Sequence, residues 1–121
     1  MTRVLVIGFD PAAIPGPDRT AVAPAFEHAR VRAAQEGIDL VECLIQPDES
    51  AAAQIRGSLQ DSDWDAVVIG GGIRKPEPAL ELFEYVVNLA HFHAPAAVIA
   101  FNTSPADTVE AAQRALQAVA G

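Results

Sequence analysis

The chain has 121 residues, of which 50% are hydrophobic and 20% charged, and its net charge is −8. These proportions are typical of one globular domain and exclude a disordered chain. The acidic balance disfavours nucleic acid and anionic membrane as partners, because both attract basic surfaces. No apolar run approaches the ~20 residues of a membrane span, and a single cysteine permits no internal disulfide. We therefore expect a cytoplasmic protein with no membrane partner.

Apolar runs and segments with helical spacing alternate along the chain in four strand–helix units. Strands are predicted at residues 3–9, 39–45, 65–69 and 96–101, and helices at 22–36, 48–59, 78–93 and after residue 104. Gly37 is placed to end the first helix. Ser104 is predicted to cap the last helix, with Pro105 at its first position and Asp107 in its first turn, where these residue types are favoured.

The character of the strands predicts the fold. Three of the four are almost continuously apolar, as in parallel strands covered by helices on both faces. Glu42 makes the second strand the most polar, which suits an edge of the sheet. Residues 1–121 are therefore predicted to form one domain, a three-layer α/β/α sandwich with a four-stranded parallel sheet in the flavodoxin-like order 2-1-3-4. The alternative order, 1-2-3-4, would need an apolar second strand.

The loops after the first and third strands meet at the point where this strand order reverses, which is where open α/β sheets bind ligands. The third strand runs into three glycines followed by Arg74 and Lys75, the only lysine in the chain. Backbone N–H groups and two cations can together hold an anion. We expect a small anionic ligand, held by Gly70, Gly71, Gly72, Arg74, Lys75, Asn102, Thr103 and Thr20. Alternatively, the glycines only permit close packing, and the cations are solvated or paired with Glu77 and Glu81.

The first loop, residues 10–21, is longer than the ~2–6 residues usual for such connections. Pro11, Pro15 and Pro17 stiffen it, so a semi-rigid flap over the crevice is expected. Asp10, at the end of the first strand, is a candidate for an acid or base. An ordered surface excursion without a ligand is the alternative interpretation.

Known crevice chemistries are mostly excluded by the motifs. The glycine run follows the wrong strand for a dinucleotide fingerprint, and Gly72-Ile73-Arg74 lacks the Gly-Lys-Ser/Thr of a phosphate loop. The first loop has too few hydroxyl residues for FMN, so no cofactor is expected. Residues 4–11 resemble the opening strand and turn of pyroglutamyl peptidases. That match ends there and Cys43 lies in a predicted strand, so the resemblance implies no peptidase activity.

No metal site is predicted. His91 and His93 end the third long helix, but residues two apart on a helix point in different directions. The loop acids Asp61, Asp63 and Asp65 precede the third strand, where solvated carboxylates are the simpler interpretation.

The helix predicted at 78–93 has two apolar stripes, more than one face of a sheet requires. The stripe assigned to the sheet comprises Leu80, Phe83, Val86, Val87 and Ala90. The second comprises Leu82, Tyr85, Leu89 and Phe92. Surplus apolar surface with aromatic residues is typical of an interface, so a homodimer through the second stripe is predicted. The alternative is that other elements of the same chain cover it.

Three functions remain open. The sequence favours a protein of uncharacterised function that binds a small anion in the crevice. The second possibility is a homodimeric interaction module with a vestigial crevice. The third is a small hydrolase-type enzyme that uses Asp10, with Arg74 and Lys75 stabilising negative charge.

Overall fold

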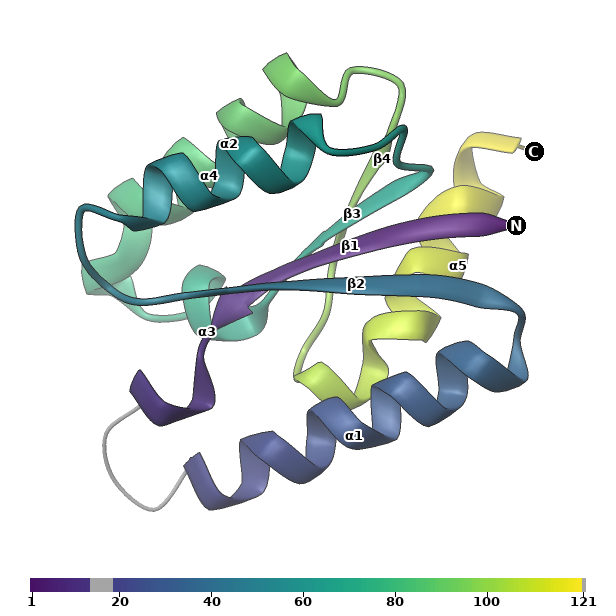
Figure 1. The fold of residues 1–121 in the computed structure, drawn as a ribbon, viewed down its shortest axis with the longest axis horizontal. Helices are drawn as coiled ribbons and strands as arrows, with labels where there is room; N and C mark the ends of the chain where they lie inside the picture. Colours follow the sequence, from purple (N-terminus) through teal and green to yellow (C-terminus); the bar gives the residue numbers. More distant parts are fainter. Residues whose placement is uncertain (14–18, 121) are drawn as a thin grey trace.

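The computed structural model describes residues 1–13 and 19–120, without the side chains of Arg19 and Thr20. Figure 1 shows the arrangement of its strands and helices. The strands are β1 (Thr2–Phe9), β2 (Ile38–Ile45), β3 (Ala66–Ile69) and β4 (Val98–Phe101). The helices are α1 (Arg19–Gln35), α2 (Ala51–Gln60), α3 (Gly71–Arg74), α4 (Leu80–His93) and α5 (Thr108–Ala120). Short 3-10 helices lie at Pro11–Ala13, Glu77–Ala79 and Pro105–Asp107. Among the described residues, no helix is both long and apolar enough to cross a bilayer.

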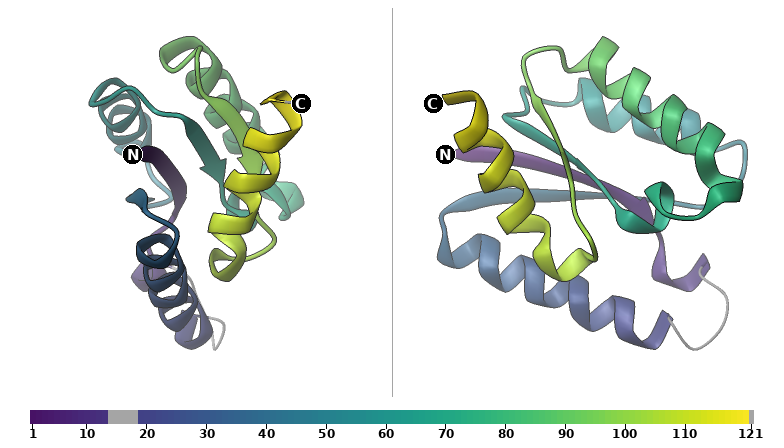
Figure 2. Two further views of the ribbon diagram at one scale, coloured as in Figure 1. Left: turned by 90° about the vertical axis from the view of Figure 1, so that its right-hand side faces the viewer. Right: turned by 180° about the vertical axis from the view of Figure 1, so that it is seen from behind.

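The four strands form one parallel sheet in the order β2-β1-β3-β4, which confirms the predicted flavodoxin-like order. Helices α1 and α5 pack on one face of the sheet, and α2 and α4 pack on the other (Figure 2). The result is the expected three-layer sandwich. Strand order reverses between β1 and β3, so the loops that follow these strands border the same crevice.

The polarity of β1, β2 and β3 matches their positions in the sheet. Residues 4–7 of β1 and 66–69 of β3 are almost fully buried, because helices cover both faces of these central strands. Strand β2 is an edge strand, as Glu42 indicated, and this carboxylate lies 2.9 Å from the guanidinium of Arg30. Gly37 ends α1 with a φ of 67°, a backbone conformation that glycine adopts without steric cost.

The glycine run forms a helix that was not among those predicted from the sequence. Residues Gly71–Arg74 form the short helix α3, with Gly70 in extended conformation at its N-cap. Glycine has low helix propensity, so local sequence pattern does not predict this helix. Tertiary packing stabilises it: a Cβ on Gly71 would lie 2.9 Å from the carbonyl oxygen of Thr103. The absence of a side chain allows α3 to pack closely against the loop after β4.

The two apolar stripes predicted on α4 are only partly correct. Leu89 is buried and Leu82 packs against the core, so the expectation that these two leucines are surplus was wrong. The reason is that α2 lies beside α4 on the same face of the sheet (Figure 2), and α4 must therefore bury a wider arc. Tyr85 and Phe92 are exposed, at 42% and 76%. Leu80, which was assigned to the sheet, is also exposed.

Candidate functional site

The candidate site lies beyond the carboxyl ends of β1, β2 and β3. Part of the predicted flap, residues 14–18, lies outside the described residues, as do the side chains of Arg19 and Thr20. The described walls of the site are the segment after β2, the short helix α3, and the chain that leads into α4. The loop after β4 packs against the glycine segment, residues 70–72, and closes that side of the site.

The side chain of Asn102, from the loop after β4, lies against the amino end of α3. Its side chain is buried, and its Oδ1 accepts a hydrogen bond from the Gly71 N–H at 2.8 Å. The Nδ2 of the same amide donates to the Thr108 hydroxyl at 3.0 Å, which in turn donates to the Pro105 carbonyl. The predicted anion-binding donor on Gly71 is therefore satisfied by a side chain of the protein itself. Asn102 joins the glycine segment to the start of α5.

The two cations after the glycines also bind the β4–α5 loop. The guanidinium of Arg74 donates to the Asn102 carbonyl at 3.0 Å and lies over the Phe101 ring. The Lys75 ammonium donates to the Thr103 carbonyl. Both cations thus act as links between α3 and this loop, and neither forms an ion pair with a carboxylate among the described residues.

Thr103 and Ser104 are held by the carboxylate of Asp107. It accepts hydrogen bonds from both N–H groups of these residues and from the Thr103 hydroxyl, at 2.6–3.2 Å. The Ser104 Oγ accepts from the Ala106 N–H, which completes the capping box predicted around Ser104. Partial burial raises the pKa of Asp107, but these hydrogen bonds outweigh it and leave that pKa below its ordinary value.

Asp10, the candidate acid or base, has both carboxylate oxygens engaged in hydrogen bonds. One accepts from the Ala12 N–H at 2.9 Å, within the turn that follows β1. The other accepts from the Gln46 side chain at 3.1 Å, across the gap to the end of β2. Through these contacts Asp10 joins the turn after β1 to the segment after β2.

Phe9 divides the crevice into two pockets. The smaller, of about 70 Å³, lies between the glycine segment, Asn102 and the start of α1. The larger, of about 440 Å³, lies on the α2 and α4 side and is lined mainly by apolar groups. Its lining residues are Phe9, Gln46, Pro47, Asp48, Ala51, Gly72, Pro76, Pro78, Ala79 and Leu82. We call this larger space the proline pocket.

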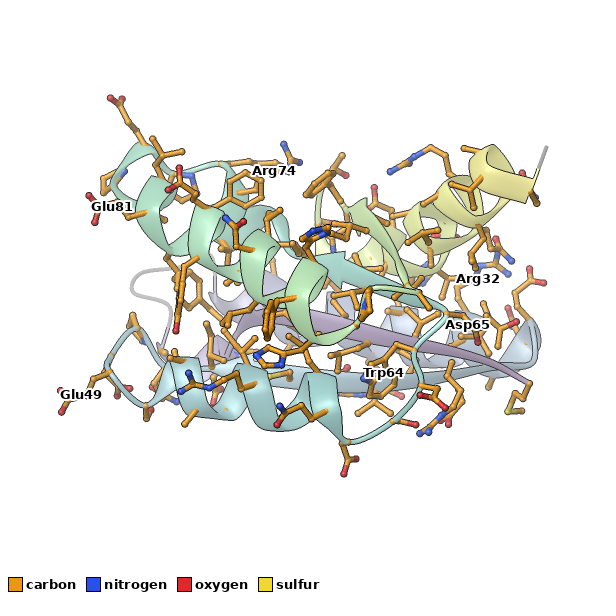
Figure 3. All side chains as sticks on the ribbon, turned by 90° about the horizontal axis from the view of Figure 1, so that it is seen from above. Arg32, Glu49, Trp64, Asp65, Arg74 and Glu81 are labelled. Carbon is orange, nitrogen blue, oxygen red and sulfur yellow. The ribbon has the colours of Figure 1, made fainter. Side chains whose placement is uncertain are left out.

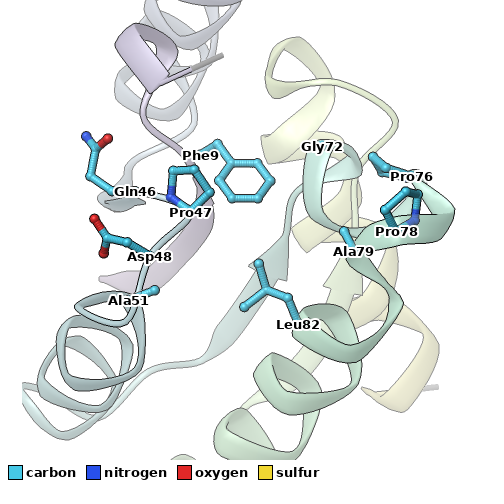
Figure 4. Close-up of a pocket in the computed structure, with 10 residues that line it drawn as sticks. All are labelled: Phe9, Gln46, Pro47, Asp48, Ala51, Gly72, Pro76, Pro78, Ala79 and Leu82. Atoms are coloured by element: carbon cyan, nitrogen blue, oxygen red, sulfur yellow. The ribbon is translucent and has the colours of Figure 1, made fainter. Parts of the chain in front are cut away.

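Figure 4 shows how the proline pocket is built. Phe9 lies between Pro47 and the glycine segment, and the prolines before α4 form the opposite wall. Gln46 and Asp48 direct their polar ends away from Phe9, toward the outer side of the pocket. The interior therefore presents ring and methyl groups to a ligand, and the polar groups stand at the rim.

The structure brings together only part of the predicted site. Gly70, Gly71, Gly72 and Asn102 line the smaller pocket, and of these only Gly72 also lines the proline pocket. The apolar walls of the pocket were not predicted from the sequence. A signal was present, because Pro47 follows the second strand and Pro76 and Pro78 follow the third, but apolar loop residues from separate segments form a pocket only after the sheet assembles.

Comparisons with known proteins add no assignment: no family model matches the chain, and no curated protein matches its sequence. Among the described residues, no group of three or more His, Cys, Asp and Glu side chains is placed to hold a metal ion.

Proposed function

We propose that the protein binds a small organic ligand in the proline pocket. The observation that carries this proposal is the pocket itself, about 440 Å³ in volume and located at the reversal of strand order. Ligand pockets in proteins are typically ~300–1,000 Å³ and mostly apolar with a few polar groups. In open α/β sheets they lie beyond the carboxyl ends of the strands.

This proposal keeps the small-ligand part of the sequence hypothesis but moves the ligand away from the cations. A bound anion at the glycine segment would compete with Asn102 for Gly71 and with backbone carbonyls for Arg74 and Lys75. Neither cation lines the proline pocket. The free energy of binding would therefore come mainly from apolar surface removed from water, at ~25 cal/mol per Å².

A fragment screen monitored by amide NMR shifts tests the proposal. Fragments should shift the amides of Phe9, Gly72 and Leu82. Ala79→Trp, which fills the pocket from its wall, should abolish these shifts. Ala53→Trp, a matched change at an exposed position of α2, should leave them unchanged. Fragments that bind Ala79→Trp as well as the parent protein, or that shift only distant amides, would contradict the proposal.

The second candidate function is a homodimeric interaction module, favoured by the exposed aromatic residues of α4. Tyr85 and Phe92 remain exposed at 42% and 76%. Large exposed apolar side chains grouped on one helix are typical of a contact surface. The proposed dimer uses these two residues, while Leu82 and Leu89 support them from within.

Light scattering at high protein concentration tests the dimer. The parent protein should have twice the mass of one chain, and the double variant Tyr85→Glu, Phe92→Glu should be monomeric. Val31→Glu, at an exposed valine on α1, is the control and should remain dimeric. A monomeric parent protein would refute the dimer, and so would a dimeric double variant.

A further inference from the structure

We infer that the ligand of the proline pocket is an apolar molecule carrying a positive charge, an inference that rests on the proposed function. Three observations support it: the walls of the pocket, the charges along its rim, and the direction of its polar side chains.

The walls disfavour a buried charge of either sign. Rings and aliphatic groups line the interior, and the polar ends of Gln46 and Asp48 lie on the outer side (Figure 4). Transfer of an ion into such surroundings carries a large desolvation cost. A ligand that fits must therefore place an uncharged, apolar body inside and keep any charge at the rim.

Most of the charges along the rim are negative, and the two cations that precede the lining residue Pro76, Arg74 and Lys75, donate to carbonyls of the β4–α5 loop. Asp48 lines the pocket. Three exposed glutamates, Glu49, Glu77 and Glu81, are each adjacent in sequence to a lining residue. Glu49 and Glu81 stand at the same end of the molecule, away from Trp64 (Figure 3). None of these four carboxylates forms an ion pair within the part of the chain that the structure describes.

Asp48 is fixed at the rim in its charged form. Its Oδ1 accepts hydrogen bonds from the N–H and the hydroxyl of Ser50, and these bonds hold the pKa of the carboxyl below its ordinary value. Among the residues that the structure describes, no lysine or arginine lines the pocket. The potential at the pocket mouth is therefore negative, which attracts a cation and repels an anion.

The chemical class that satisfies both conditions is a small organic ammonium or guanidinium ion with an apolar body. The body lies against Phe9, Pro47 and Leu82, and the cation remains at the mouth, partly hydrated and close to the carboxylates. This arrangement avoids desolvation of the charge and complements the rim.

Three probes with the same body and different charges test the inference: 3-phenylpropylammonium, 3-phenylpropanol and 3-phenylpropanoate. Their dissociation constants are measured by titration of the Gly72 and Leu82 amide shifts. Affinity should decrease in the order cation, alcohol, anion, with about two- to fivefold between neighbouring probes at low salt. Added salt to ~1 M, where the Debye length falls to ~3 Å, should remove the preference while the alcohol still binds.

Substitutions of rim carboxylates, compared with substitutions of carboxylates elsewhere, test the role of the charge. Glu77→Gln with Glu81→Gln should weaken the cation about two- to fivefold and leave the alcohol unchanged. Asp61→Asn with Asp63→Asn removes the same charge from exposed acids outside the pocket lining and should change neither probe. An equal or greater affinity for the anion, or an unchanged cation affinity in the Glu77 and Glu81 variant, would overturn the inference. Failure of all three probes to shift pocket amides would instead count against the proposed function.

Discussion

At the scale of single residues, Asn102 shows how one buried side chain can connect three segments. Its amide accepts from Gly71 and donates to Thr108, and its carbonyl accepts from Arg74. A buried amide that makes these bonds avoids the cost of about 1–3 kcal/mol that each unsatisfied polar group would bring. The contacts depend on a very close approach of the loop after β4 to α3.

Gly71 is the residue that allows this approach, and a matched pair of substitutions tests it. In Gly71→Ala the new Cβ would lie 2.9 Å from the Thr103 carbonyl oxygen, so the loop must shift, at a cost of ~1–3 kcal/mol. In Gly57→Ala, within α2, the Cβ meets nothing within 4 Å, and the helix should gain ~0.5–1 kcal/mol. Urea unfolding of both variants measures these free energies. Equal stability of the two variants would refute the close packing of Gly71.

At the scale of elements, the start of α5 depends on the charge of Asp107. Its carboxylate holds Thr103 and Ser104 at the amino end of the helix, where a negative charge is also favoured by the helix dipole. Because its pKa is lowered in the folded protein, the unfolded chain binds the proton more tightly. This contribution to stability is thus present above the unfolded pKa of ~3.9 and is lost as the pH falls through the folded pKa.

The variant Asp107→Asn should therefore be less stable than the parent protein at pH 7, by ~0.5–2 kcal/mol. The difference should shrink as the pH falls from ~5 to below the folded pKa. Denaturant unfolding at several pH values measures it. Asp61→Asn, at an exposed loop acid, should run parallel to the parent protein across the series. A gap between Asp107→Asn and the parent protein that stays constant with pH would contradict the role assigned to this charge.

At the scale of the whole molecule, the sheet and its two helical layers protect even the edge strand. Cys43 lies on β2 and is 2% exposed, within the cluster between the sheet and α2. Burial raises the pKa of its thiol. Both effects oppose reaction, because the thiolate is the reactive form and the reagent must reach it.

Cys43 should accordingly report global unfolding, and the chain has no other cysteine to complicate the signal. A disulfide reagent should label the native protein slowly. The free energy of opening derived from the labelling rate should equal the free energy of unfolding measured with urea. Rapid labelling in native buffer would give a free energy of opening well below the free energy of unfolding measured with urea. That result would show instead that β2 opens locally from the sheet.

The sequence alone determined the parallel sheet, its order and the capped start of α5. These features follow from local patterns: continuous apolar strands, Glu42 on the edge, and Ser104, Pro105 and Asp107 at fixed spacing. The crevice at the reversal of strand order followed from topology. Each of these rules needs only residues that are near one another in the chain.

Only the tertiary structure decided which groups remain free to bind a ligand. Asn102 and the glycine segment are 31 residues apart, and nothing local shows that one satisfies the other. The same holds for Arg74, Lys75, the two leucines that α2 covers, and the prolines that meet around Phe9. These donors and apolar surfaces are satisfied by partners distant in sequence, so their availability is fixed only when the chain packs.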